Sequence, residues 1–348
     1  MTKQSILTKE DEIIIAQSKQ MNEVGLLSGK TGVCIYYYIS GRIYNNQQYI
    51  KLADNLFDEI YKNMSATNIR FDNGLIGIGC AIEYLVQHGY VTGDTDEILQ
   101  EIDVQVLKQL TNDDNLCNLN LTNGCAGYLC YLIFRLQNQI FNKKYDSLHK
   151  LKNELLFHLI NNIEKNLIAS FASINRDISF DLFASFPLII KLLRKSYDLE
   201  IYNVKILRII EQVLGCLDTM IPKLNINRLY LVSVLLEFSN IVKSKQLEKC
   251  INFLLYSTDY DNIVNEITEH DLSLRTGISG TKYILWNILK KLSIENNYYN
   301  KINRVYNTIN NQLPPLSIDD NLLTLDVGIS QGIIGMKLVN YLIEEKIK

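Results

Sequence analysis

Asn73-Gly74-Leu75-Ile76-Gly77-Ile78-Gly79 is the stretch of sequence that decides the fold of this chain. Two glycines three residues apart are followed at once by an apolar run, and the same arrangement returns four more times. The other copies are Ser28-Gly29-Lys30-Thr31-Gly32, Asn123-Gly124-Cys125-Ala126-Gly127, Thr276-Gly277-Ile278-Ser279-Gly280 and Gln331-Gly332-Ile333-Ile334-Gly335. Self-similarity at a regular interval indicates a repeat architecture.

The interval between copies is about 50 residues, which leaves room for two more between Gly124 and Gly277. Two segments stand at the expected places without the glycines. They are Asp181-Leu182-Phe183-Ala184-Ser185-Phe186 and Asn225-Ile226-Asn227-Arg228-Leu229-Tyr230. The sequence therefore predicts seven repeats.

Each repeat also contains a second helix of a different kind. Residues 49–64 and 96–110 place apolar side chains on one face and charged side chains between them, which is typical of amphipathic helices. The segment 7–20 supplies one more such helix. We therefore expect an all-α fold, a closed α/α toroid of seven helical hairpins. It forms a single domain, 1–348, whose N-terminal helix, 7–20, completes the outer ring.

Composition excludes several functional classes. The chain has 348 residues, is 47% hydrophobic and carries a net charge of -3, and no block of Lys or Arg favours nucleic acid as a partner. No apolar run reaches the length of a membrane span, and the start of the chain does not read as a signal peptide. The seven scattered cysteines favour a reduced cytoplasmic location.

The repeats around Gly29, Gly74 and Gly332 resemble those of the lanthionine synthetase C-like (LanC-like) family, and the resemblance extends from about Gly25 to Ile343. It implies a seven-fold α/α toroid and a role in the maturation of ribosomal, lanthipeptide-type peptides. The cyclases of this family use zinc to activate peptide cysteine thiols, which add to dehydroalanine or dehydrobutyrine. The implied partners are a peptide substrate or a modifying enzyme.

The zinc-binding part of the family pattern is replaced in this chain. The family carries Trp-Cys-Tyr-Gly at the fifth repeat and Cys-His-Gly at the sixth. Here the fifth repeat has no cysteine, and the sixth reads Arg275-Thr276-Gly277. Zinc requires thiolate or imidazole ligands, and arginine stays protonated. We therefore expect no metal site, no cofactor and no independent cyclase activity.

In such a toroid the starts of the inner helices gather at one end, so the polar residues beside each glycine share a mouth. The candidate substrate-binding residues are Lys30, Asn73, Asn123, Arg228, Arg275 and Gln331. Arg228 and Arg275 stand where the cyclases hold metal. They either bind a carboxylate or phosphate of a ligand, or pair with neighbouring carboxylates of the protein itself.

Two alternatives to peptide binding stay open. Asp72, Asp181 and Asp326 form a set of carboxylates of the kind that glycoside hydrolysis requires, so a carbohydrate-active enzyme is one of them. His270, just before the sixth repeat, is the residue around which a zinc site of an active cyclase would be rebuilt.

Overall fold

The computed structural model describes residues 9–65, 68–112, 118–141, 147–174, 179–183, 185–218, 221–267, 271–312 and 326–347, and the regular elements among them are helices. The contacts within the chain divide it into two compact units. Unit 1 comprises Met1–Asn112, Leu272–Leu274 and Leu313–Lys348, and unit 2 comprises Asp113–Asp271 and Arg275–Gln312. The expectation of a single domain therefore stays a prediction.

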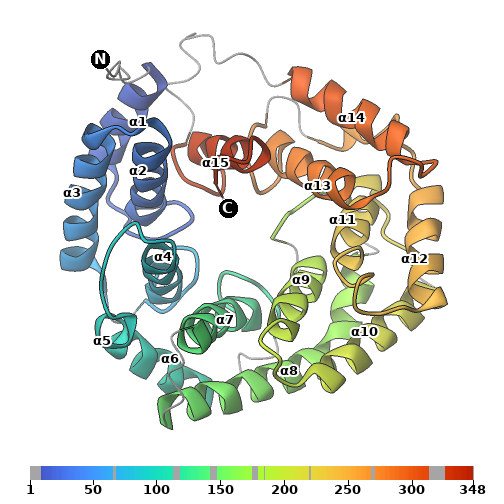
Figure 1. Ribbon diagram of the computed structural model, residues 1–348, viewed down its shortest axis with the longest axis horizontal. Helices are drawn as coiled ribbons and strands as arrows, with labels where there is room; N and C mark the ends of the chain where they lie inside the picture. The colour runs from blue at the N-terminus through green and yellow to red at the C-terminus, as the bar shows by residue number, and fades with distance from the viewer. Residues whose placement is uncertain are drawn as a thin grey trace. The chain divides into compact units, whose positions relative to one another are not determined.

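Unit 1 contains two layers of helices. Its described helices are α1 (Lys9–Gln20), α2 (Lys30–Tyr44), α3 (Gln47–Asn63), α4 (Leu75–Gln87), α5 (Thr95–Ile98), α6 (Gln100–Asn112) and α15 (Ile333–Ile343). The apolar helices α2, α4 and α15 form one layer, and α1, α3, α5 and α6 form the other (Figure 1).

Unit 2 is layered in the same way. Its described helices are α7 (Cys125–Phe141), α8 (Ser147–Ile174), α9 (Ser185–Tyr197), α10 (Asn203–Leu217), α11 (Asn225–Leu235), α12 (Lys245–Tyr256), η2 (Val264–Glu266), α13 (Ile278–Lys291) and α14 (Tyr299–Gln312). Helices α7, α9, α11 and α13 form one layer, against which α8, α10, α12 and α14 pack (Figure 1). Among the described residues, no helix has both the length and the apolar character to cross a membrane.

The two kinds of helix differ in burial as the sequence predicts. In α2, the residues from Thr31 to Gly41 are all buried. In α3, burial is limited to Tyr49, Ala53, Leu56 and Ile60, which lie along one face.

One expectation needs correction: residues 96–110 do not form a single helix, because the helix is divided at Leu99 (φ -99, ψ 7). Leu99 is fully buried, so tertiary packing overrides the local helical pattern there.

Five helices begin with the same backbone hydrogen bond. In α2, α4, α7, α13 and α15 the N–H of the first helical residue donates to the carbonyl oxygen seven residues earlier, and every N···O distance is 2.8 or 2.9 Å. In α4, for example, Leu75 N donates to Asn68 O. A Cβ on the preceding residue, Gly74, would lie 2.5 Å from that same oxygen. Glycine is therefore required for the loop to return so closely to its helix.

The second glycine of the motif also sits in a close approach. A Cβ on Gly77 would lie 2.0 Å from the carbonyl oxygen of Phe71 and 2.9 Å from Cβ of Leu26 in the neighbouring loop. Gly335 is placed in the same way against Ile329 and Leu274. These glycines allow one loop to pack against the next.

A buried carboxylate attaches the N-terminal helix to unit 1. Asp11 of α1 is 2% exposed, and its two oxygens accept hydrogen bonds from Tyr36 of α2 and Tyr49 of α3. Lys337 of α15 forms an ion pair with Glu10, and the ring of Tyr341 stacks on Tyr36. The last helix therefore has α1 and α2 as neighbours.

Gly77→Ala tests the loop packing. Since the added methyl group meets backbone rather than a movable side chain, we expect the free energy of unfolding to fall by about 2 kcal/mol or more. Gly215→Ala is the matched control, because Gly215 lies in α10 with no atom near its missing Cβ. It should raise the free energy of unfolding by about 0.5–1 kcal/mol. Denaturant titration of both variants measures these changes. Equal changes in the free energy of unfolding for the two variants would contradict the inferred loop packing.

The tyrosines around Asp11 predict a loss of stability in alkali. Burial, together with Tyr341 and Asp11, raises the pKa of Tyr36 above its ordinary value of about 10. The folded state therefore favours the neutral phenol, and this contribution is present below pH 10 and lost as the pH rises above it. Tyr36→Phe should make the decline above pH 10 shallower by up to about 1.4 kcal/mol per pH unit.

At neutral pH the same variant should lose about 1 kcal/mol of stability, because Asp11 loses one hydrogen-bond donor. Tyr256→Phe, at a tyrosine that is 78% exposed, should change neither the stability at neutral pH nor its decline above pH 10. Denaturant titration of the wild type and both variants at a series of pH values measures these unfolding free energies. Parallel pH curves for the wild type and Tyr36→Phe would show that the inferred linkage is wrong.

Candidate functional site

The loops that precede the helices carry most of the candidate residues, and four loops start with an equivalent side chain. Asn68, Asn118, Asp271 and Asp326 each lie six residues before the glycine that precedes the helix. In three of these loops the side-chain oxygen also accepts the backbone N–H two residues on, at 3.3 Å for Asn68, 2.9 Å for Asn118 and 2.9 Å for Asp326. Asp326 therefore occupies a position at which an amide serves equally well, so its charge is not needed for this contact.

The two candidate asparagines are engaged inside their own loops. Asn73 accepts a hydrogen bond from Nδ2 of Asn68 at 3.1 Å, and Asn123 accepts one from Nδ2 of Asn118 at 3.3 Å. Sequence analysis did not single out Asn68 and Asn118. Their recurrence six residues before a glycine was the signal that pointed to them.

In unit 1, two further candidates form ion pairs with neighbouring residues. Lys30 donates to Glu59 of α3 at 2.5 Å, so its ammonium group is held against the adjacent helix. Asp72 accepts from Nε and Nη2 of Arg70 at 2.9 and 2.7 Å, one bond to each oxygen. Gln331 is exposed in the last loop. A ligand that approaches Lys30 or Asp72 therefore meets a charge that already has an oppositely charged partner.

In unit 2, Arg275 and Asp181 meet although they are far apart in sequence. Nε and Nη2 of Arg275 donate to Oδ2 of Asp181 at 3.0 and 2.8 Å, and the backbone N–H of Leu182 donates to the carbonyl oxygen of Arg275 at 2.7 Å. The side chains of Arg275 and Asp181 are 35% and 29% exposed. The ion pair therefore joins two loops and stays within reach of solvent.

Arg228 has a different environment. Its guanidinium donates to the carbonyl oxygens of Pro222, Lys223 and Ser257 and to the side chain of Asn225. Burial lowers the pKa of Arg228, and the nearby Glu266 opposes that effect. These contacts tie the start of α11 to the end of α12, so Arg228 supports the local fold.

Glu266 caps the N-terminus of α11, which has no glycine loop. One carboxylate oxygen accepts from the backbone N–H and the Nδ2 of Asn225 at 3.0 and 2.7 Å, and the other accepts from the N–H of Ile226 at 2.9 Å. Helix N-termini attract anions. At α11 that capacity is already used by a side chain of the protein.

A charged cluster that sequence analysis missed joins α9, the segment just after α11, and α13. Helices α9, α11 and α13 are neighbours in Figure 1. Lys191 donates to the hydroxyl of Tyr283, and Lys291 donates to Glu237 at 2.8 Å. Burial alone would raise the pKa of Glu237, but Lys191 and Lys291 lower it below its usual value. The signal was a lysine inside the apolar run Ile189-Ile190-Lys191-Leu192-Leu193.

The residues at the sixth repeat do not fit a zinc ion. Arg275 offers donors to a carboxylate, and the hydroxyl of Thr276 donates to Asp271 at 2.7 Å. Burial raises the pKa of the thiols of Cys34 and Cys250, each of which donates to a backbone carbonyl. No group of three or more His, Cys, Asp or Glu suited to a metal occurs in the described part of the chain. His270 lies outside the described residues.

Comparison with known proteins identifies the family. No curated protein matches the chain in sequence. The solved structure of nisin cyclase superimposes with a TM-score of 0.67 at 13% identity, and the match covers 97% of this chain and 94% of that one. This match confirms the expected fold class, the all-α LanC-like α/α toroid. The family profile described as "Lanthionine synthetase C-like protein" matches residues 20–223. The chain belongs to the lanthionine synthetase C-like family.

Proposed function

We propose that this protein takes part in lanthipeptide-type peptide maturation by binding a peptide, without zinc and without closing thioether rings itself. The observation that carries the proposal is the ion pair between Arg275 and Asp181. It stands at the sixth repeat, where the family pattern has the zinc ligands Cys and His. A guanidinium there excludes a metal cation and favours a carboxylate.

Arg275 is suited to exchange its partner. Its bonds from Nε and Nη2 go to one and the same oxygen of Asp181, and about a third of its side chain is exposed. A peptide carboxylate can present the same acceptor geometry as Asp181, and charge-assisted bonds to arginine are among the stronger hydrogen bonds in proteins. The peptide is either a precursor awaiting modification or a segment of a modifying enzyme, and the setting is a bacterial cytoplasm.

The two alternatives have less support. A carbohydrate-active enzyme needs a carboxylic acid that donates a proton, but Asp72 and Asp181 both accept hydrogen bonds from arginine. Asp326 accepts a backbone N–H of its own loop. A zinc cyclase needs three protein ligands, and Arg275 and Thr276 stand where two of them belong. Peptide binding without metal requires neither a proton-donating carboxylic acid nor a set of zinc ligands.

Metal content is the first test of the proposal. Inductively coupled plasma mass spectrometry of the purified, untagged protein should find far less than one zinc per chain, both before and after incubation with zinc followed by desalting. Retention of one zinc per chain would contradict the proposal. It would indicate a rebuilt site, with His270 as the first residue to substitute.

A synthetic peptide with one dehydroalanine, one free cysteine and a free C-terminal carboxylate tests binding and catalysis together. The peptide should bind the wild-type protein, as measured by fluorescence anisotropy. Its thiol content should stay constant during incubation with the protein and zinc. Arg275→Ala should weaken binding at least about ten-fold, since a hydrogen bond to a charged group contributes about 1.5–3 kcal/mol. The C-terminal amide of the same peptide should bind equally weakly to the wild type and to Arg275→Ala.

Two control variants accompany this test. Arg70→Ala removes an arginine–aspartate pair from another loop and should leave the affinity unchanged. Arg228→Ala should lower the free energy of unfolding without weakening peptide binding, because its guanidinium contacts the protein's own carbonyl oxygens. Loss of the peptide thiol, or unaltered affinity in Arg275→Ala, would show that the proposed function is wrong.

A further inference from the structure

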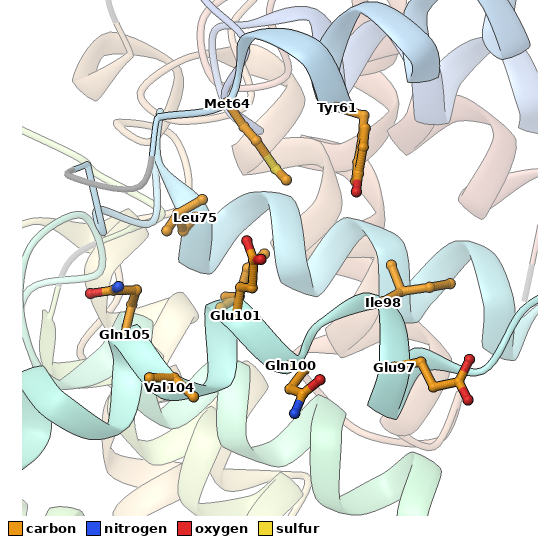
Figure 2. Close-up of a pocket in the computed structure, with 10 residues that line it drawn as sticks. Tyr61, Met64, Leu75, Glu97, Ile98, Gln100, Glu101, Val104 and Gln105 are labelled. Carbon is orange, nitrogen blue, oxygen red and sulfur yellow. The ribbon is translucent and has the colours of Figure 1, made fainter.

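Unit 1 contains a cleft that is separate from the loops that precede the helices. It has a volume of about 530 Å³ and lies between the end of α3, the start of α4 and the segment α5–α6 (Figure 2). Leu75 and Ile102, which are 4% and 3% exposed, belong to its lining. This volume is within the range of pockets that hold ligands or partner side chains.

The lining includes large apolar side chains that are open to solvent. Tyr61 is 65% exposed, Ile98 is 40% exposed and Val104 is 55% exposed. In Figure 2, Met64 and Tyr61 descend from α3 toward Glu101 and Ile98, which rise from the segment below. Apolar side chains gathered around a concavity mark a surface that a partner covers.

The charge of this cleft has one sign. Among the lining residues that the structure describes, the charged ones are Glu97 and Glu101, both exposed, and none is a lysine or arginine. Neither carboxylate forms an ion pair with a residue that the structure describes. Lower effective dielectric in a cleft strengthens the attraction to a cation, so Lys or Arg of a partner is favoured here.

The spacing of the lining residues indicates the shape of the occupant. Within α6, Glu101 lies three and four residues before Val104 and Gln105, so these lining residues share one face of that helix, and Ile98 adds an apolar side chain from the end of α5. The face on α6 covers about one helical turn, roughly 5 Å along the helix axis. Laying an amphipathic helix into an apolar groove is a recurrent mode of recognition.

We propose that this cleft docks a cationic amphipathic helix of a second polypeptide. Apolar side chains of that helix enter between Tyr61 and Ile98, and its Lys or Arg side chains pair with Glu97 and Glu101. This docking surface is additional to the peptide-binding loops and does not depend on Arg275.

The test uses two labelled synthetic peptides in fluorescence anisotropy. One carries leucine on one helical face and lysine elsewhere, and the other replaces every lysine by glutamate. The lysine peptide should bind the wild-type protein, the glutamate peptide should not, and added salt should weaken binding. The double variant Glu97→Lys/Glu101→Lys should lower the affinity for the lysine peptide at least about ten-fold.

A matched double variant separates this site from general charge attraction. Glu211→Lys/Glu248→Lys makes the same change in net charge at exposed positions on α10 and α12, and it should bind the lysine peptide as the wild type does. Ile98→Ser tests the apolar part and should also weaken binding, with helical content checked by circular dichroism. Equal loss of affinity in both charge variants, or no binding of the lysine peptide, would overturn the proposal.

The outcome is independent of the proposed function. Glu97→Lys/Glu101→Lys should leave binding of the dehydroalanine peptide unchanged, and Arg275→Ala should leave binding of the lysine peptide unchanged. If the lysine peptide does not bind as expected but the dehydroalanine peptide does, only the proposed docking surface is wrong. If the dehydroalanine peptide does not bind as expected but the lysine peptide does, only the proposed function of the loops is wrong.

Discussion

The structure depends on one backbone hydrogen bond, which runs from the first residue of a helix to the carbonyl oxygen seven residues earlier. It recurs at the starts of α2, α4, α7, α13 and α15. Since each loop returns so closely to its helix, a Cβ at the preceding glycine would collide with the same oxygen. The loops are thereby fixed and can bond to one another, as Leu27 N does to Asp72 O and Ser330 N does to Leu27 O.

At the fifth repeat, where this loop is absent, side chains replace the backbone contacts. Glu266 satisfies the free N–H groups at the start of α11, and Arg228 binds the carbonyl oxygens around it. Arg275 at the sixth repeat is balanced by Asp181. Both repeats at which the family pattern places zinc ligands therefore hold charges that the protein compensates internally. This is the physical basis for proposing a metal-free peptide-binding role.

Sequence reasoning placed the candidate site only in part. It named Arg275 and Asp181, and left open whether they pair with each other or with a ligand; the structure pairs them across 94 residues of sequence. It grouped Asp326 with the catalytic candidates, whereas the structure gives it the same loop position as Asn68 and Asn118. The cluster around Glu237 was missed, because its lysines and tyrosine come from two different helices.

The sequence by itself determined the all-α class, the recurring helix starts and the family, because glycine spacing and apolar periodicity are local properties of the chain. Only the tertiary structure decided the partners of the charged side chains and the break at Leu99. The same holds for the acidic cleft, whose apolar wall is assembled from Tyr61, Ile98 and Val104 on three different helices. Such contacts depend on distances between residues remote in sequence, and a local pattern carries no information about those distances.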